Sequence, residues 1–179
     1  MRVPAPADAL RVARALLMLS QRDAAEGAKV MQKSVSAAET SKSTLLETNL
    51  SLVDFYTSKG ILLLGEGMVG EEVVRSGARW VAPEAPGGGS ALSTFHGEET
   101  GVSFRAARAL LNKKQAQVAE AANLTLDVVK GLETETRARE PHRTLKEWYE
   151  QQGVEFTGFG DVSSGKFYGV GVRWKPARP

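Results

Sequence analysis

Apolar residues recur at helical spacing at the start of each half of the chain. Leu10, Ala13 and Leu16 belong to one such stripe, and a second runs through residues 104–111. After the first stripe, the pattern predicts helices at 21–28, 32–39 and 44–58 and strands at 61–64 and 77–81. After the second, it predicts helices at 115–122, at 126–132 and between Pro141 and Gly153, then strands at 154–159 and 168–174.

Polar residues at the ends of these segments indicate where the helices begin and end. The expected N-caps are Asp8, Ser20, Ser103, Asn112 and Thr125. Ser20 and Asp23 together fit a capping box. Lys29 and Asn123 fall at the breaks between short helices, and Asn tolerates the left-handed backbone that such a break favours.

The two halves repeat one sequence. Residues 11–39 and 105–133 align without a gap at an offset of 94, and 12 of the 29 positions are identical. Looser similarity continues from 51–67 to 144–160 and from 75–80 to 169–174. The chain is therefore read as two copies of one module.

The stretch between the copies has the composition of a linker. Pro83 and Pro86 hold part of it extended, and the run 87–90, which is Gly-Gly-Gly-Ser, gives it freedom. The expected domains are residues 1–81 and 102–179, joined by a flexible linker at 82–101. A long surface loop inside one domain is the alternative.

Composition excludes several classes of function. The chain is 42% hydrophobic and 25% charged, which suits a folded protein, and it has no cysteine, so disulfides, thiolate metal sites and a cysteine nucleophile are absent. With only two histidines, the composition does not point to a histidine-rich metal site. Asp8, Arg11 and Arg14 interrupt the apolar N-terminus, which therefore does not read as a signal peptide, and a cytoplasmic protein without membrane contact is expected.

The segments RALLMLSQRDAAEGAKVMQKSVSAAE and RALLNKKQAQVAEAANLTLDVVKGLE resemble the Cro/C1-type (XRE-like) helix-turn-helix of bacterial and phage regulators. In the first copy the matching positions include Arg14, Ala15, Leu16, Leu17, Leu19, Ser20, Gln21, Ala25, Ala28, Val30 and Glu39. The resemblance implies a mainly α fold, with two lambda-repressor-like bundles of four to five helices, each followed by a short β-hairpin. The chain departs from the family pattern at Lys29 and Asn123, where glycine is usual, and at Met31 and Lys114, where the usual helix cap is lost.

By this resemblance the chain is a sequence-specific regulator of transcription, a repressor of phage-like or mobile-element genes, that binds double-stranded DNA in the nucleoid. Side chains on the third helix of each copy would read base edges in the major groove, because Gln pairs with adenine and Lys donates to guanine. The expected base readers are Gln32, Lys33, Ser36 and Lys130. The expected phosphate contacts are Gln21, Arg22, Lys42, Lys113, Lys114, Gln115, Arg137, Arg139 and Arg143, the last three in a loop before the fourth helix. Arg14 with Glu39, and Arg108 with Glu133, are expected to form structural ion pairs.

Other interpretations are weaker or remain open. An activator, or an interaction module whose second copy binds RNA polymerase, another regulator or a second subunit, is the alternative, because Leu126 and Asp127 suit base reading poorly. Strands 61–64 and 154–159 have edges that allow a homodimer. GEGMVG at 65–70 fits a dinucleotide-binding pattern, but no βαβ unit surrounds it. His96 and His142 lack catalytic companions, so no enzyme, cofactor or metal is expected.

Overall fold

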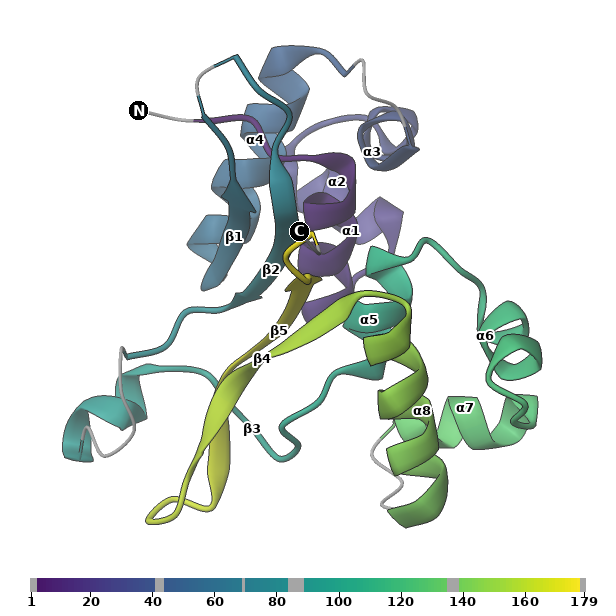
Figure 1. The fold of residues 1–179 in the computed structure, drawn as a ribbon. Helices are drawn as coiled ribbons and strands as arrows, with labels where there is room; N and C mark the ends of the chain where they lie inside the picture. Colours follow the sequence, from purple (N-terminus) through teal and green to yellow (C-terminus); the bar gives the residue numbers. More distant parts are fainter. Residues whose placement is uncertain (1–2, 41–43, 69, 84–88, 135–138, 178–179) are drawn as a thin grey trace.

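The computed structural model describes residues 3–40, 44–68, 70–83, 89–134 and 139–177 (Figure 1). The first repeat forms α1 (Ala7–Leu16), α2 (Gln21–Ala28), α3 (Gln32–Thr40), α4 (Leu46–Ser58), β1 (Ile61–Glu66) and β2 (Val74–Trp80). The second forms α5 (Phe104–Leu110), α6 (Gln115–Ala121), α7 (Leu126–Glu133), α8 (Arg139–Gln151), β4 (Val154–Asp161) and β5 (Lys166–Trp174). The predicted order of helices and strands is confirmed in both copies.

Special backbone positions recur at the repeat offset. Met18 and Asn112 both have a φ above +50°, and so do Lys29 and Asn123 at the breaks after α2 and α6. Lys29 adopts the left-handed conformation in which its N–H reaches the last carbonyls of α2. A left-handed residue is the usual way to end a helix, and here Lys and Asn take the position without glycine. The sequence prediction of a tight break at these two positions is confirmed.

The strands of both repeats join in one antiparallel sheet of five strands. β1 pairs with β2 and β4 pairs with β5, and β2 also pairs with β5, so the spatial order across the junction is β1-β2-β5-β4. The described protein is 49% helix and 20% strand. The prediction of a mainly α fold with short separate hairpins was therefore wrong, because the two hairpins extend each other into a shared sheet.

Two glycines allow β2 and β5 to lie this close. Gly77 faces Arg173 in the strand pair, and Gly171 faces Arg79. A Cβ on Gly77 would lie 2.6 Å from the Arg173 Cα, and one on Gly171 would lie 2.6 Å from the Arg79 Cβ. Both separations are below van der Waals contact, so a side chain at either position would push the two strands apart.

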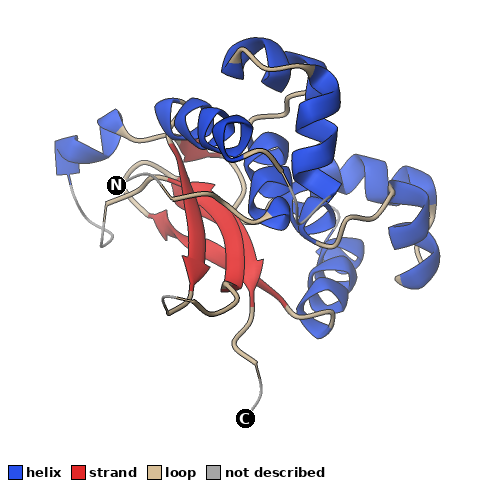
Figure 2. Ribbon diagram, turned by 90° about the horizontal axis from the view of Figure 1, so that it is seen from above, coloured by secondary structure: helices blue, strands red, loops and turns tan. Residues whose placement is uncertain are grey.

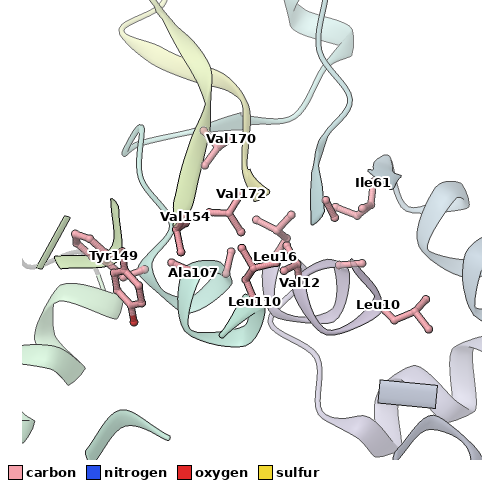
Figure 3. Packing of buried hydrophobic residues seen from close by; sticks show 14 of the residues in the cluster. Leu10, Val12, Leu16, Ile61, Ala107, Leu110, Tyr149, Val154, Val170 and Val172 are labelled. Carbon is pink, nitrogen blue, oxygen red and sulfur yellow. The ribbon is translucent and has the colours of Figure 1, made fainter. Parts of the chain in front are cut away.

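One apolar core runs through both repeats. Leu10 and Val12 on α1 and Ala107 and Leu110 on α5 belong to the same buried cluster as Val172 on β5 (Figure 3). Helices α1 and α5 contact each other and pack against the sheet, and in the view from above most of the helices gather to one side of the strands (Figure 2). Burial of this shared surface stabilises the association of the repeats, since apolar burial contributes roughly 25 cal/mol per Å².

Several predicted helix ends differ in the structure. Pro6, not Asp8, precedes α1, and Asp8 lies in its first turn, where its carboxylate accepts hydrogen bonds from Ser76 Oγ (2.6 Å) and Trp174 Nε1 (2.7 Å). The N-cap of α6 is Lys114 and not Asn112. α8 begins at Arg139, so Pro141 occupies its first turn, where a missing N–H costs nothing. Capping by Ser20, Ser103 and Thr125 is confirmed.

The segment expected to be a linker contains structure in its described part. Residues Gly89–Thr94 form a 3₁₀ helix, and β3 (Gly97–Glu98) pairs with β5. The His96 ring stacks on Trp80 with the ring centres 3.6 Å apart. The domain boundaries at 81 and 102 stay a prediction, but the described flanks of the segment are tied to the sheet and to the first repeat.

Candidate nucleic-acid interface

Helices α2 and α3 are joined by the three residues 29–31, the connection length of a helix-turn-helix. The Ser20 side chain accepts from the Asp23 N–H while Asp23 accepts from the Ser20 N–H, so the predicted capping box fixes the start of α2. Val35 on α3 is buried. The expected base readers Gln32 and Lys33 are exposed, and Ser36 is half-buried. α3 thus presents one polar face to solvent.

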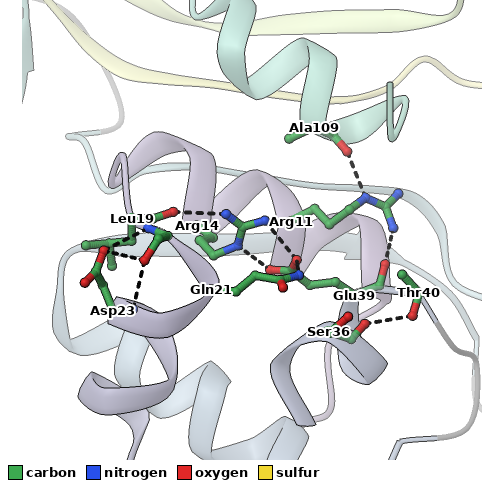
Figure 4. Close-up of polar contacts among 10 residues, drawn as sticks. Arg11, Arg14, Leu19, Gln21, Asp23, Ser36, Glu39, Thr40 and Ala109 are labelled. Carbon is green, nitrogen blue, oxygen red and sulfur yellow. Dashed lines mark hydrogen bonds and ion pairs between the residues drawn. The ribbon is translucent and has the colours of Figure 1, made fainter. Parts of the chain in front are cut away.

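A buried ion pair holds α3 against α1. The Arg14 guanidinium donates to both carboxylate oxygens of Glu39 at 2.6 and 2.9 Å, and also to the Leu19 carbonyl at 3.0 Å (Figure 4). Glu39 is 2% exposed and Arg14 is 23% exposed. Burial disfavours the charge on Arg14, but the hydrogen bond and charge of Glu39 outweigh burial and raise the Arg14 pKa. The predicted structural role of this pair is confirmed.

Gln21 belongs to the same network. Its Nε2 donates to Glu39 Oε2 at 2.9 Å, so the side chain links the first residue of α2 to the C-terminal end of α3. The half-buried Gln21 amide therefore holds α2 and α3 together. A phosphate contact by Gln21 stays a prediction.

The second repeat copies this network atom for atom. Arg108 donates to the two Glu133 oxygens at 2.6 and 3.0 Å and to the Lys113 carbonyl at 3.3 Å, and Gln115 donates to Glu133 at 2.8 Å. The Glu133 side chain is fully buried. The same triad therefore orients α7 on α6 and α5.

A tyrosine lies beneath each network. Tyr56 and Tyr149 are fully buried, and neither hydroxyl finds a hydrogen-bond partner among the described residues. Burial raises the pKa of both hydroxyls, and the negative charges of Glu39 and Glu133 add to the effect. Both tyrosines therefore stay neutral and serve as packing for α4 and α8.

The exposed faces of α3 and α7, the third helix of each repeat, differ. Position by position, Gln32, Lys33 and Ser36 of α3 correspond to Leu126, Asp127 and Lys130 of α7. Leu126, Asp127 and Lys130 are all exposed, and Leu126 is 38% exposed. α7 thus presents an apolar group and a carboxylate where α3 presents an amide and a cation.

The expected phosphate contacts are spread around these helices. Arg22 and Lys114 are exposed, and Lys113 and Gln115 are half-buried. Arg139 and Arg143 lie on α8 and not in a loop, because the helix starts earlier than predicted. Arg143 also pairs with Glu140 at 3.3 Å, and this pair competes with phosphate. Lys42 and Arg137 lie outside the described residues.

Arg11 bridges the two repeats, a role that the sequence pattern did not predict. Its Nε donates to the Ala109 carbonyl at 2.9 Å and one terminal nitrogen donates to the Glu39 carbonyl at 2.5 Å (Figure 4). The other terminal nitrogen donates to the Leu110 carbonyl at 3.3 Å. These carbonyls lie at the C-terminal ends of α5 and α3, where the partial negative charge of the helix dipole attracts a cation. One guanidinium therefore ties α3 of the first repeat to α5 of the second. The recurrence of arginine at position 105 is the sequence signal that marks this position.

Comparisons with family models, curated proteins and solved structures found no match. Within the residues that the structure describes, no cluster of three or more acidic or histidine side chains has the arrangement to hold a metal ion. None of the described helices has the length and apolar character needed to cross a membrane. Interpretation of the site therefore rests on its geometry and its residue chemistry.

Proposed function

We propose that this protein is a sequence-specific DNA-binding regulator of transcription in which one chain carries both reading units. The observation that carries the proposal is the two-fold relation between the repeats. Ala78 pairs with Val172, its own counterpart at offset 94, while Gly77 faces Arg173 and Arg79 faces Gly171. Such reciprocal pairing is the pattern of a two-fold symmetric interface.

This two-fold relation suits the symmetry of duplex DNA. Helix-turn-helix proteins bind two half-sites about 34–36 Å apart, and the dyad of the DNA matches the dyad of the protein. In Figure 1, α2 and α3 lie at one end of the α1 and α5 pair and α6 and α7 at the other, both displaced to the same side. The arrangement therefore has the form of a dimeric reader built within a single chain.

The chemistry of α3 supports direct reading of bases. Gln32 can make a bidentate pair with adenine, and Lys33 can donate to the guanine acceptors in the major groove. The Arg14–Glu39 pair and Gln21 hold these side chains on a rigid helix, which base reading requires. The resemblance to Cro/C1-type regulators adds repression of phage-like or mobile-element genes as the cellular role.

The test is selection of duplexes from a random-sequence pool, followed by fluorescence anisotropy on the recovered sequence at two salt concentrations. We expect one enriched motif. The protein should bind this motif more tightly than random duplex, and its affinity should fall as the salt concentration rises. No enrichment over random duplex at either concentration would contradict it.

A second function is supported by α7. Leu126 and Asp127 stand exposed where base readers are expected, and an apolar side chain beside a carboxylate suits a protein surface better than a phosphate-lined groove. In this alternative the first repeat binds DNA and the second recruits RNA polymerase or another regulator. Loss of DNA binding on substitution of Lys130 would argue against it, because a partner-binding α7 does not touch DNA.

A further inference from the structure

A cleft lies on the local two-fold axis, between the turn that joins α1 to α2 and the turn that joins α5 to α6. It has a volume of about 180 Å³. Its lining consists of positions 11, 14, 15, 18 and 19 of the first repeat and the five positions 94 residues later. Because both repeats contribute the same positions, the cleft belongs to the junction of the repeats and to neither repeat alone.

The lining is basic. It holds four arginines and one lysine, and it contains no carboxylate. Two of the arginines, Arg14 and Arg108, are neutralised from behind by Glu39 and Glu133. Among the described residues, no hydrogen bond or ion pair engages the side chains of Arg105 and Lys113. Two half-buried cations therefore face the cleft uncompensated.

Arg11 adds a third positive charge and fixes the shape of the cleft. Its guanidinium makes hydrogen bonds to carbonyl oxygens, not to a carboxylate, so it keeps its full charge while it bridges the two repeats. Burial lowers its pKa, with the charges of Asp8 and Glu39 acting in the opposite direction. A bound anion would relieve this burial of positive charge.

We infer that the cleft binds a backbone phosphate at the centre of the DNA site, between the two half-sites that α3 and α7 contact. The inference rests on the proposed function. A cleft on the protein dyad faces the centre of the DNA site when both units are docked, and the backbone phosphates that flank the DNA dyad are the nearest anions. The clamp adds affinity for any sequence, and it fixes the spacing of the two half-sites. The alternative source of the same chemistry is a small phosphate compound that binds the free protein.

The test compares two variants that lose the same charge. In the cleft variant, Arg105→Gln and Lys113→Gln are combined. The control combines Lys59→Gln with Lys166→Gln, two exposed lysines at the end of α4 and the start of β5, neither of which lines the cleft. Anisotropy on the selected duplex and on a random duplex is measured over a range of salt.

The cleft variant is expected to bind both duplexes more weakly, and to reduce the slope of log K against log salt by about 1 to 2, since each lost phosphate contact removes roughly one counterion. The control is expected to keep the wild-type slope. Equal slopes for the two variants would overturn the inference, while the wild-type protein would still bind its selected site and leave the proposed function intact.

Inorganic phosphate distinguishes the two sources of the anion. Titration into the free protein, followed by calorimetry and by the NMR signals of residues 105 and 113, is expected to show no saturable binding below millimolar concentration. Tight binding that disappears in the cleft variant, with DNA affinity unchanged, would assign the cleft to a small phosphate compound and overturn the inference. Absence of DNA binding by the wild-type protein would refute the proposed function itself.

Discussion

Ala78 lies opposite Val172 across the strands β2 and β5, and the two residues occupy the same position of the repeat. The local two-fold axis passes between them. Their neighbours pair reciprocally, with Gly77 facing Arg173 and Gly171 facing Arg79. A junction that in a dimer would join two chains is here formed within one, and folding of one chain therefore fixes the placement of α3 relative to α7.

Enlarging either junction glycine should weaken this association. Gly77→Ala and Gly171→Ala each place a methyl group 2.6 Å from an atom of the facing strand. Overpacking of this kind costs about 1–3 kcal/mol of unfolding free energy. Urea denaturation measures it, with Gly67→Ala as the matched control, because a Cβ there meets its nearest atom at an ordinary 3.4 Å. Wild-type stability in both junction variants would show that the strands can separate without cost.

The order of elements was predictable because it depends on local signals. Apolar periodicity placed the helices, and Ser20, Ser103 and Thr125 marked their starts through caps that involve residues at most three positions away. The pairing of β2 with β5 was not predictable in this way. It joins residues 92 to 96 positions apart, and the glycines that permit it read in the sequence as residues that weaken a strand.

The candidate site was predicted in part, for a similar reason. The pairs Arg14–Glu39 and Arg108–Glu133 follow from matched positions in the two copies. The start of α8 was missed because Pro141 reads as a boundary when it is in fact tolerated in the first turn. Asp8 reads as a cap, and its bond to Trp174 depends on a strand of the other repeat that no local pattern reveals.

Removal of the Glu39 charge should destabilise the first repeat. Glu39→Gln leaves the Arg14 guanidinium without its carboxylate, and we expect the free energy of unfolding to fall by about 2–3 kcal/mol. This is less than the ~3–5 kcal/mol for breaking a fully buried pair, because Arg14 is 23% exposed. Urea denaturation measures the loss. The double variant Arg14→Met with Glu39→Leu should be less destabilised, since no charge is left unpaired. An equal loss in both would show that packing, not charge, explains the effect.

Base reading by α3 predicts a selective loss of affinity. Gln32→Ala and Lys33→Ala should each weaken the binding free energy for the selected duplex by about 1–3 kcal/mol, and should change that for random duplex little. Arg22→Ala, at an exposed position on α2, is the comparison, because a phosphate contact contributes equally to both duplexes. Anisotropy on the two duplexes measures both effects. Unchanged specific affinity in both α3 variants would exclude the first repeat as the base reader.

The junction should weaken in acid. The hydrogen bonds of Glu155 with Arg173 and Arg75, at 3.0 and 2.9 Å, lower the Glu155 pKa below its ordinary 4.5 against the opposing effect of burial. A carboxylate whose pKa is lower in the folded state than in the unfolded state stabilises the fold at pH values above its unfolded pKa. This contribution is lost as the pH falls from about 4.5 through the pKa of the folded state. Glu155→Gln should therefore be less stable than the wild type at about pH 7, and should lose less stability between about pH 5 and pH 3. Parallel losses in the two proteins, measured by urea denaturation, would exclude this pair as a source of the acid sensitivity.

One chain should suffice to bind one DNA site. If both repeats read DNA as proposed, one chain should occupy both half-sites, because β2 and β5 join the repeats. The two halves should differ in sequence, because α3 and α7 present different side chains. Native mass measurement of the complex should give one chain on a duplex of about two turns, and footprinting should show an asymmetric site. Two chains on a palindrome, contacted through the first repeat alone, would contradict the arrangement.

A variant with matched helices separates reading by both repeats from reading by one. Changing Gln32→Leu, Lys33→Asp and Ser36→Lys gives α3 the exposed residues of α7 at the corresponding positions. If both units read DNA, this variant should select a site whose two halves are inverted copies, because two identical reading surfaces related by a dyad require identical half-sites. The reciprocal variant, Leu126→Gln with Asp127→Lys and Lys130→Ser, should select the other half-site in duplicate. If that variant selects the wild-type sequence unchanged, α7 does not touch DNA, and the second repeat is then left free for a protein partner.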